Sequence, residues 1–359
     1  MKMLSRLIPK NHFCSFFIFR EEPFINWEYT NIVLFTAFDF YRSNSFWIDE
    51  IMRTGKTLKE GLIDLGFPKN VDLMADTGIF EIEAKKAGFA KKLGIEVEFK
   101  LSNEEVFHAY EISGADFFVT PDEIIHPLDT KETVKRKVAA IKENTLQLLE
   151  IVPSNQVTGI IQGCKTKTIE LLFDFFKSCG IKYLARGGAV PLYKYDNQHF
   201  ENIMFKTREI TNEYWLHTFG LPRVSLLPYY IHTMKFDSVD TSLLLYLSAR
   251  KQYLVGINPR PVRLVDFLSC DCKGCQLLQE LKVKRNNYGK EFFIALYIHN
   301  IVEASQISTD KSRKKSQKKT KNNSREEKHK SAFITKKSGE SDWITVKQLI
   351  EKKHEDKEL

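Results

Sequence analysis

The 359-residue chain has no long apolar run and few cysteines, and both shortages restrict what it can be. No hydrophobic stretch approaches the roughly 20 residues that a membrane-spanning helix needs. The longest early stretch, residues 13–19, ends at Arg20 without a signal-peptide cleavage pattern. Three of the six cysteines, Cys14, Cys164 and Cys179, are scattered without the spacing of a disulfide framework. We therefore expect a soluble protein of the reducing cytoplasm.

Acidic residues are too few to balance the basic ones in one segment, residues 305–330. The net charge of the whole chain is +8, and residues 305–330 alone carry a balance of +7. The rest of the chain is close to neutral, so electrostatic attraction to nucleic acid is expected mainly at the tail, with local patches elsewhere left open. We expect residues 304–359 to be mostly disordered, with a short amphipathic helix at 342–353.

Short apolar segments alternate with amphipathic helices along most of the chain. This alternation predicts an α/β fold with a parallel sheet, and its length suits a (β/α)8 TIM barrel. A doubly wound open sheet is the alternative, but the chain has no G-x-G-x-x-G motif after a first strand. The expected strands are 31–38, 71–76, 115–120, 156–162, 181–185, 214–219 and 236–239, and the expected helices are 45–65, one ending near Lys92, 103–113, 130–151, 168–179, 197–212 and 224–234.

The barrel is expected to use most of the chain. Residues 1–69 supply its first elements, and residues 70–303 form the remainder, with a zinc-binding subdomain at about 265–303. The clearest helix is 130–151, whose apolar face is predicted from its spacing. That face consists of Val134, Val138, Ile141, Leu146 and Leu149.

Three cysteines with C-x-C-x-x-C spacing, Cys270, Cys272 and Cys275, are followed 24 residues later by His299. Thiolates at this spacing can face one point, and a histidine can complete a tetrahedron around a structural Zn²⁺. The alternative is three unrelated buried thiols. We favour the metal site because half of the six cysteines fall within six residues.

Polar residues follow successive predicted strands, where a parallel barrel places its catalytic groups. Each one alone has a simpler explanation, since an Asp after a strand often caps a helix and Gly-Gly often makes a turn. Together they predict a site in which paired carboxylates suit glycosidic chemistry and an Asp with a Gln suits a purine edge. The residues are Asp76, Phe80 as a stacking face, Asp122, Gln162, Gly188, Asp237 and Asp240.

Six short motifs, taken in order, resemble those of the tRNA-guanine transglycosylases, in a form similar to the archaeal one. These enzymes exchange a guanine base in RNA for a 7-deazaguanine. The resemblance covers roughly residues 70–303, and the zinc spacing matches as well. The motifs are D-T-G-I-F from Asp76, G-I-I-Q-G from Gly159, G-G-A-V-P-L from Gly187, H-T-F-G from His217, F-D-S from Phe236 and L-Y-I-H-N from Leu296.

The resemblance implies a pentosyltransferase that works by a retaining, two-step exchange on a TIM barrel. Asp237 would be the nucleophile that attacks C1′, although Asp240, three residues later, is an alternative. Asp76 would be the acid/base that moves protons on the departing and incoming bases.

Base recognition is also implied by the resemblance. Asp122 and Gln162 would read the base edge, Gly188 would offer backbone contacts, and Phe80 would pack on the ring. Thr77 and Ile79 stand where the family has Ser and Gly, so the pocket floor is expected to differ in shape.

The resemblance further implies Zn²⁺ as cofactor, in a lobe that helps to grip nucleic acid, with pairing of two chains through the zinc region as homodimer or heterodimer. Pro191 and Leu192 replace the bacterial signature, which favours an uncharged base such as preQ0. The expected polymer is tRNA. The alternatives are an enzyme that inserts 7-deazaguanine into DNA, and a non-catalytic nucleic-acid-binding subunit.

Overall fold

The computed structural model describes residues 12–16, 32–42, 53–64, 69–70, 72–79, 101–262, 270–282 and 289–309. The chain divides into two compact units, Met1–Thr309 and Asp310–Leu359, and the second lies outside the described residues. Phe80, the helix expected near Lys92 and the tail helix expected at 342–353 also lie outside them. Within the described residues no helix is both long and apolar enough to cross a membrane.

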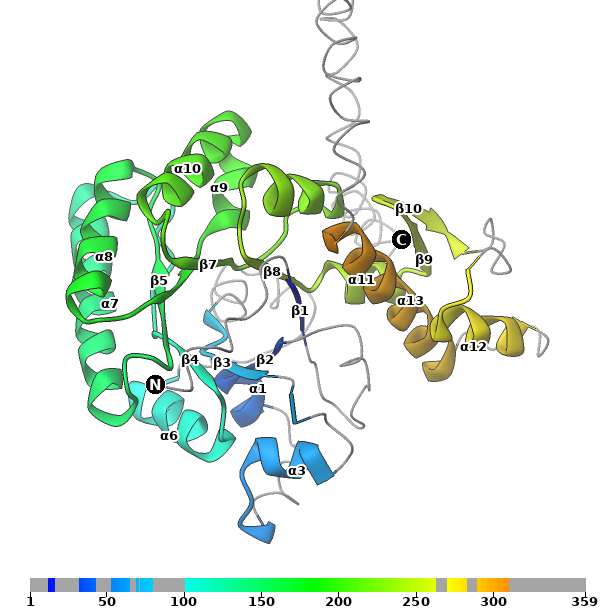
Figure 1. Cartoon of the computed structure of the whole chain (residues 1–359). Helices are drawn as coiled ribbons and strands as arrows, with labels where there is room; N and C mark the ends of the chain where they lie inside the picture. The colour runs from blue at the N-terminus through cyan, green and yellow to red at the C-terminus, as the bar shows by residue number, and fades with distance from the viewer. Residues whose placement is uncertain are drawn as a thin grey trace, which may run out of the picture. The chain divides into compact units, whose positions relative to one another are not determined.

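A curled parallel sheet forms the centre of the first unit (Figure 1). Each strand pairs with the next one in the sequence, and β1 pairs with β2 on one side and with β8 on the other. The predicted parallel sheet of a mixed α/β fold is thereby confirmed. The strands are β1 (His12–Phe16), β2 (Ile32–Thr36), β3 (Asp72–Asp76), β4 (Phe117–Val119), β5 (Val157–Ile161), β6 (Tyr183–Arg186), β7 (Trp215–Thr218) and β8 (Ser238–Thr241).

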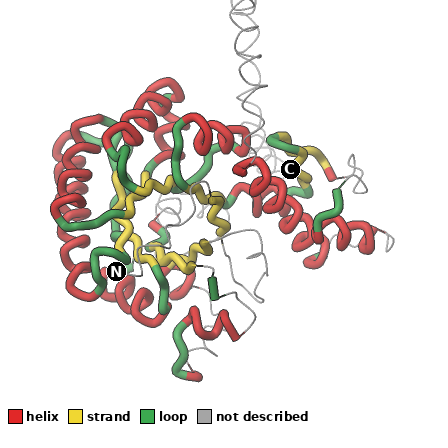
Figure 2. The backbone as a smooth tube through the Cα atoms, viewed as in Figure 1, coloured by secondary structure: helices red, strands yellow, loops and turns green. Residues whose placement is uncertain are grey.

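Helices cover the outside of this sheet (Figure 2). Local signals set their ends: Ser102 and Glu105 form a capping box at the start of α6, and Gly114 ends that helix in the left-handed conformation. The helices are α1 (Ala37–Arg42), α3 (Leu58–Asp64), α6 (Asn103–Ser113), α7 (Lys131–Ile151), α8 (Thr166–Ser178), α9 (Ala189–Tyr195), α10 (Asn197–Ile210) and α11 (Leu243–Ala249). A 3₁₀ turn, η2 (Val224–Leu226), and a π-helical turn, η3 (Tyr229–Thr233), precede β8.

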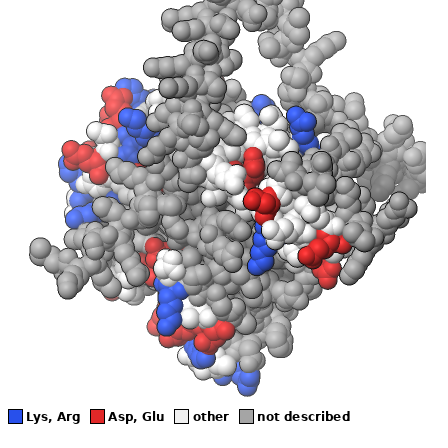
Figure 3. All heavy atoms as spheres, turned by 45° about the vertical axis from the view of Figure 1, so that its right-hand side comes forward, with Lys and Arg blue, Asp and Glu red and all other residues white. Residues whose placement is uncertain are grey.

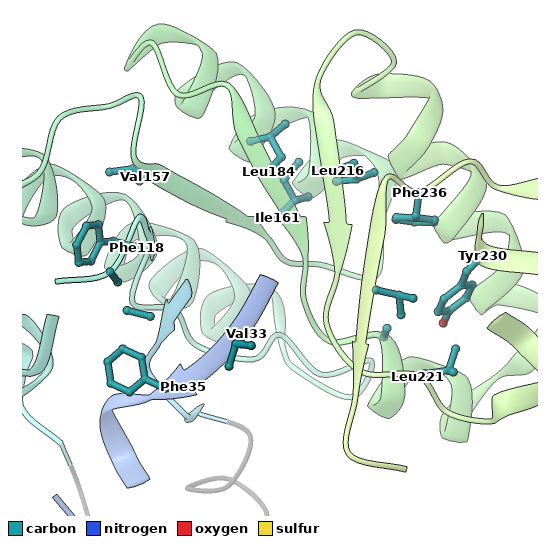
Figure 4. Packing of buried hydrophobic residues seen from close by; sticks show 14 of the residues in the cluster. Val33, Phe35, Phe118, Val157, Ile161, Leu184, Leu216, Leu221, Tyr230 and Phe236 are labelled. Atoms are coloured by element: carbon teal, nitrogen blue, oxygen red, sulfur yellow. The ribbon is translucent and has the colours of Figure 1, made fainter. Parts of the chain in front are cut away.

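The two faces of the sheet pack into different apolar clusters, because successive side chains on a strand point to opposite sides. The outer cluster contains strand residues such as Val33 and Leu184 (Figure 4), and it combines them with Val239 and with residues from the helices. The inner cluster contains residues of the strands, including Ile32 and Ala185, and also Phe219, which directly follows β7. Membership of a cluster therefore tells which way a strand residue faces.

Three details of the predicted helices and strands are wrong. On α7, Leu146 is 52% exposed, whereas Thr145 and Leu148 are buried, because the helical phase turns Leu146 away from the sheet. The segment expected as one helix at 224–234 is two short turns, η2 and η3. The last strand begins at Ser238, two residues later than expected.

A smaller lobe follows the sheet. Strands β9 (Gln252–Val255) and β10 (Asn258–Pro261) form an antiparallel pair, and helices α12 (Lys273–Lys282) and α13 (Lys290–Thr309) pack on each other. Helix α13 joins the lobe to the sheet, since Leu296 lies in the apolar cluster of the lobe and Ile307 in the outer cluster. The boundary expected at residue 303 is therefore too early: the helix continues to Thr309, with Ala304 fully buried.

Candidate functional site

The predicted cluster of Cys270, Cys272, Cys275 and His299 is assembled in the lobe. Its ligand atoms all lie within 4.8 Å of one another, and the three sulfurs are 3.7, 3.5 and 3.3 Å from Nδ1 of His299. With Zn–S bonds of about 2.3 Å and Zn–N bonds of about 2.0 Å, a tetrahedral ion holds sulfur and nitrogen roughly 3.5 Å apart. The cluster is therefore compatible with zinc binding.

The surroundings of His299 orient it for this role. Its Nε2 lies 2.8 Å from the carbonyl oxygen of Leu254, a contact that places the proton on Nε2 and leaves Nδ1 facing the sulfurs. The ring of Tyr253 stacks on His299 with centroids 3.6 Å apart. Gly274 permits the close approach of α12 to α13, since a Cβ there would lie 2.5 Å from the backbone nitrogen of His299. These contacts fix the position of His299 beside the three cysteines.

Asp122 and Gln162 form a buried pair beyond the carboxyl ends of β4 and β5. Nε2 of Gln162 donates to Oδ2 of Asp122 over 2.5 Å. Gln162 is 1% exposed and Asp122 is 6% exposed. Oδ1 of Asp122 and Oε1 of Gln162 are also buried, and neither has a hydrogen-bond partner within the described ranges. Two unsatisfied acceptors on neighbouring buried side chains are costly, at about 1–3 kcal/mol each, unless a ligand supplies donors.

Glycines after β6 lie close to the amide of Gln162. A Cβ at Gly187 would lie 2.3 Å from Nε2 of Gln162, and one at Gly188 would lie 2.7 Å from its Oε1. Gly188 also has a φ of +67°, which favours glycine. The amide of Gln162 therefore lies flat against bare backbone, and the structure brings together Asp122, Gln162 and Gly188 as the sequence predicts.

The carboxyl of Asp122 is electrostatically perturbed. Burial raises its pKa to about 7, against the lowering effect of the Gln162 hydrogen bond, and the charge of Asp76 raises the pKa further. Asp76 ends β3, and its Oδ2 accepts the N–H of Gly78 over 3.1 Å. The pKa of the buried Tyr110 hydroxyl is raised by burial first, and by both Asp76 and Asp122. Asp76 and Asp122 thus belong to one electrostatic site.

Asp237 lies elsewhere. It precedes β8, and its Oδ2 accepts the N–H of Leu216, near the start of β7, over 2.9 Å. The same oxygen accepts a hydrogen bond from Arg208 over 3.0 Å. Leu216 is near the amino end of β7 and Arg208 is on α10, so the expected position of Asp237 at a carboxyl strand end is wrong. The physical reason is the later start of β8.

Asp240 has the position that was expected of Asp237. Val239 points to the outer cluster, so its neighbours Ser238 and Asp240 point to the inner face. Oδ1 of Asp240 accepts the N–H of Gly220, beyond the carboxyl end of β7, over 2.7 Å, and lies 3.4 Å from Nε2 of His217. The carboxylate is 1% exposed. Asp240, and not Asp237, therefore faces the same side of the sheet as the end of β3.

Sequence reasoning assigned no role to Arg186, the last residue of β6. This fully buried guanidinium donates to the carbonyl oxygens of Ile161 (3.0 Å), Gly163 (2.7 Å) and Gly187. Burial lowers its pKa to about 10, and it has no ion pair within the described ranges. Arg186 thereby ties together the segments that carry Gln162 and Gly188. A lone arginine before Gly-Gly at the end of an apolar strand was the available signal.

The surface adds little to this site. On the face drawn in Figure 3, Lys and Arg side chains lie close to Asp and Glu side chains at several points.

No family model and no curated protein sequence matches the chain. The functional argument therefore rests on the geometry of the described residues.

Proposed function

We propose that the protein is a base-exchanging transglycosylase that replaces a guanine in tRNA with a 7-deazaguanine, by way of a covalent ribosyl-enzyme. The observation that carries this proposal is the pair of buried acceptors, Oδ1 of Asp122 and Oε1 of Gln162, without partners in the described part of the chain. Guanine and 7-deazaguanine both present two adjacent donors, N1–H and the 2-amino group. A base that has been flipped out of its stack can satisfy both acceptors at once.

The sheet supports the same proposal. The pairing of β1 with both β2 and β8 favours a complete (β/α)8 barrel, in which active sites lie at the carboxyl ends of the strands. Asp76, Asp122 and Gln162 lie at or just beyond such ends. Residues 17–31, between β1 and β2, lie outside the described ranges.

The two remaining carboxylates suit the two steps of the exchange. The carboxylate of Asp240 attacks C1′ of the target nucleoside, the C1′–N9 bond breaks with its electron pair going to the base, and Asp76 gives a proton to the departing guanine. In the second step the incoming base loses its N9 proton to Asp76, N9 attacks C1′, and the bond to Asp240 breaks. Two inversions give net retention. We assign the nucleophile to Asp240 because its carboxylate, unlike that of Asp237, faces the interior.

Zinc has a structural place in this proposal. Cys270, Cys272, Cys275 and His299 would hold the ion, which would supply cross-linking of the lobe and no reactive position, because protein ligands fill all four sites. The lobe would then present α12 and α13 as a stable surface beside the sheet, where nucleic acid and a second chain are expected.

A label-uptake experiment tests the function and separates it from its alternatives. The purified protein is incubated with labelled guanine or preQ0 together with tRNA or, separately, duplex DNA. We expect label in tRNA; label in DNA alone would make the protein a DNA-modifying enzyme. Label in neither polymer would contradict the proposal and favour a non-catalytic subunit.

The covalent step has its own test. After quenching in denaturant, the wild-type protein should retain cross-linked RNA, and Asp240→Ala should retain none. Asp237→Asn is the matched control and should keep the adduct. An adduct that survives Asp240→Ala and disappears with Asp237→Asn, in folded protein, would return the nucleophile to Asp237.

A further inference from the structure

His217 is a histidine in the interior of the sheet for which the exchange reaction described above has no use. It is fully buried and lies on β7 next to Ser238 of β8 in the strand register. The ring of Trp215 stacks on it with an interplanar angle of 13°, and the ring of Phe219 meets it edge-on with centroids 4.6 Å apart. Its orientation is therefore fixed by rings on both sides along the same strand.

The polar contacts of His217 determine which nitrogen carries the proton. Nδ1 lies 2.7 Å from Oγ of Ser238, and Nε2 faces Oδ1 of Asp240 at 3.4 Å. An ionised carboxylate only accepts hydrogen bonds, whereas a serine hydroxyl either donates or accepts. The tautomer with its proton on Nε2 therefore suits these neighbours, because Ser238 can then donate to Nδ1 and the Nε2–H lies on the side of Asp240. This arrangement leaves no lone pair facing the carboxylate.

Both contacts to Asp240 involve one oxygen. Gly220 N–H and His217 Nε2 approach Oδ1, and in the described part of the chain Oδ2 receives no contact of this kind. At this separation of 3.4 Å, Nε2 of His217 makes no hydrogen bond within the described residues, but contacts of this kind can tighten when a reaction complex forms. The carboxylate is thus held by one oxygen and presents the other.

We infer that His217 is a positioning residue: together with the backbone N–H of Gly220 it holds Oδ1 of Asp240, so that Oδ2 is the oxygen that bonds to C1′. This inference rests on the proposed transglycosylase function. His217 does not touch the substrate and exchanges no proton; it fixes the rotation of the carboxylate about its Cβ–Cγ bond. A nucleophile misdirected by about 1 Å can lose about 100-fold in rate.

Single-turnover adduct formation with tRNA provides the kinetic test. His217→Phe keeps a flat ring between Trp215 and Phe219 but removes the donor, and should slow adduct formation about 10- to 100-fold with little change in the RNA concentration that gives half-maximal rate. His217→Gln keeps an N–H donor at similar reach and should recover most of the rate. Zinc content and melting temperature report whether each variant is folded. A wild-type rate in folded His217→Phe overturns the inference.

A second measurement does not need activity. The ¹⁵N shifts of His217 in the labelled wild-type protein report its tautomer, and Asp240→Asn reports the contact. We expect a protonated Nε2, an unprotonated Nδ1, and a shift of the Nε2 signal in Asp240→Asn. A protonated Nδ1, or ¹⁵N shifts of His217 that are the same in Asp240→Asn as in the wild type, overturns the inference even if His217→Phe fails to fold. If the wild-type protein forms no adduct but these signals are as expected, the proposed function fails while the positioning contact stands.

Discussion

Asp116 and Asp237 form the same pair of hydrogen bonds to the backbone of a leucine, a clasp, at two places in the sheet. Each donates its own N–H to the carbonyl oxygen of a residue on the preceding strand and accepts that residue's N–H with Oδ2. The partner of Asp116 is Leu73 on β3, with both distances 2.8 Å, and the partner of Asp237 is Leu216 on β7, with both 2.9 Å. The two clasps lie four strands apart, as expected of a sheet with two similar halves.

A basic side chain completes each clasp. Lys59 on α3 pairs with Asp116, and Arg208 on α10 pairs with Asp237 over 3.0 Å. In both cases the helix directly precedes the strand whose N–H is capped. Because Asp116, which the proposed reaction does not use, makes the same contacts, we interpret those of Asp237 as structural. Asp237 therefore links α10, β7 and β8.

We expect Asp237→Ala to destabilise the protein without abolishing chemistry. The substitution leaves the mostly buried Arg208 and the N–H of Leu216 without their shared acceptor, which should lower the free energy of unfolding by about 3–5 kcal/mol. Urea unfolding measures this loss, and adduct formation per folded molecule should change little.

Asp116→Ala is the matched variant for that measurement. It removes the equivalent clasp and should also destabilise the protein, by a smaller amount, because Asp116 is more exposed, at 33% against 10% for the side chain of Asp237. Full stability in Asp237→Ala, combined with loss of the adduct, would contradict the structural role.

Asp122 should make the stability depend on pH. Its pKa of about 7 in the folded protein exceeds the ordinary unfolded value of about 3.9, so the folded state holds the proton more tightly between these limits. Its contribution to stability is therefore fully present below about pH 4 and is lost as pH rises towards 7, by at most about 1.4 kcal/mol per unit.

Asp122→Asn isolates this effect, since the amide oxygen can still accept from Gln162 but does not titrate. Unfolding free energies of wild type and variant are compared between pH 4.5 and 8. The variant should gain stability relative to wild type as pH rises, with the difference levelling off above about pH 7. A difference that does not vary with pH would contradict the raised pKa.

The positions of most elements were predictable because the pattern of apolar residues is local. Helix α6 occupies the expected residues 103–113, since its apolar spacing and both end signals are written in the sequence. The Cys₃His cluster was predictable for the same reason, because three of its four residues fall within six positions. Local spacing suffices where the geometry is local.

The choice between Asp237 and Asp240 was not predictable in this way. A strand alternates its faces with every residue, so the start of β8 at Ser238 decides which carboxylate points inward. That start is set by the pairing of β8 with β1 and β7. The sequence of residues 236–241 alone does not indicate this pairing. The contact of His217 with Asp240 depends on the same pairing. Register between distant strands is the missing information.

The metal centre predicts the behaviour of two cysteine variants. The wild-type protein should contain about one zinc ion per chain, and Cys272→Ser should lose it, with a melting temperature lower by roughly 10 °C. Cys164→Ser is the control, because Cys164 lies after β5, away from the lobe, and should retain both zinc and stability. Metal analysis and thermal unfolding report the two quantities. Full zinc content in Cys272→Ser would count against the ligand set.

Gly187→Ala should damage the pocket through Gln162. The added methyl would lie 2.3 Å from Nε2 of Gln162, so the amide must move and its hydrogen bond to Asp122 is lost. Calorimetric binding of guanine or preQ0 should weaken about 10- to 100-fold, which corresponds to about 1.4–2.8 kcal/mol.

A double variant shows whether the loss passes through Gln162. In Gly187→Ala with Gln162→Ala the methyl meets no amide. The double variant should therefore be destabilised by less than the sum of the two single variants, although the contact of the methyl with Ile160, 2.9 Å from the added carbon, remains. Base binding should stay as weak as in Gln162→Ala alone, because the acceptor is gone. If the losses of stability in the two single variants simply add in the double variant, Gly187 acts independently of the amide, since residues in contact are expected to couple.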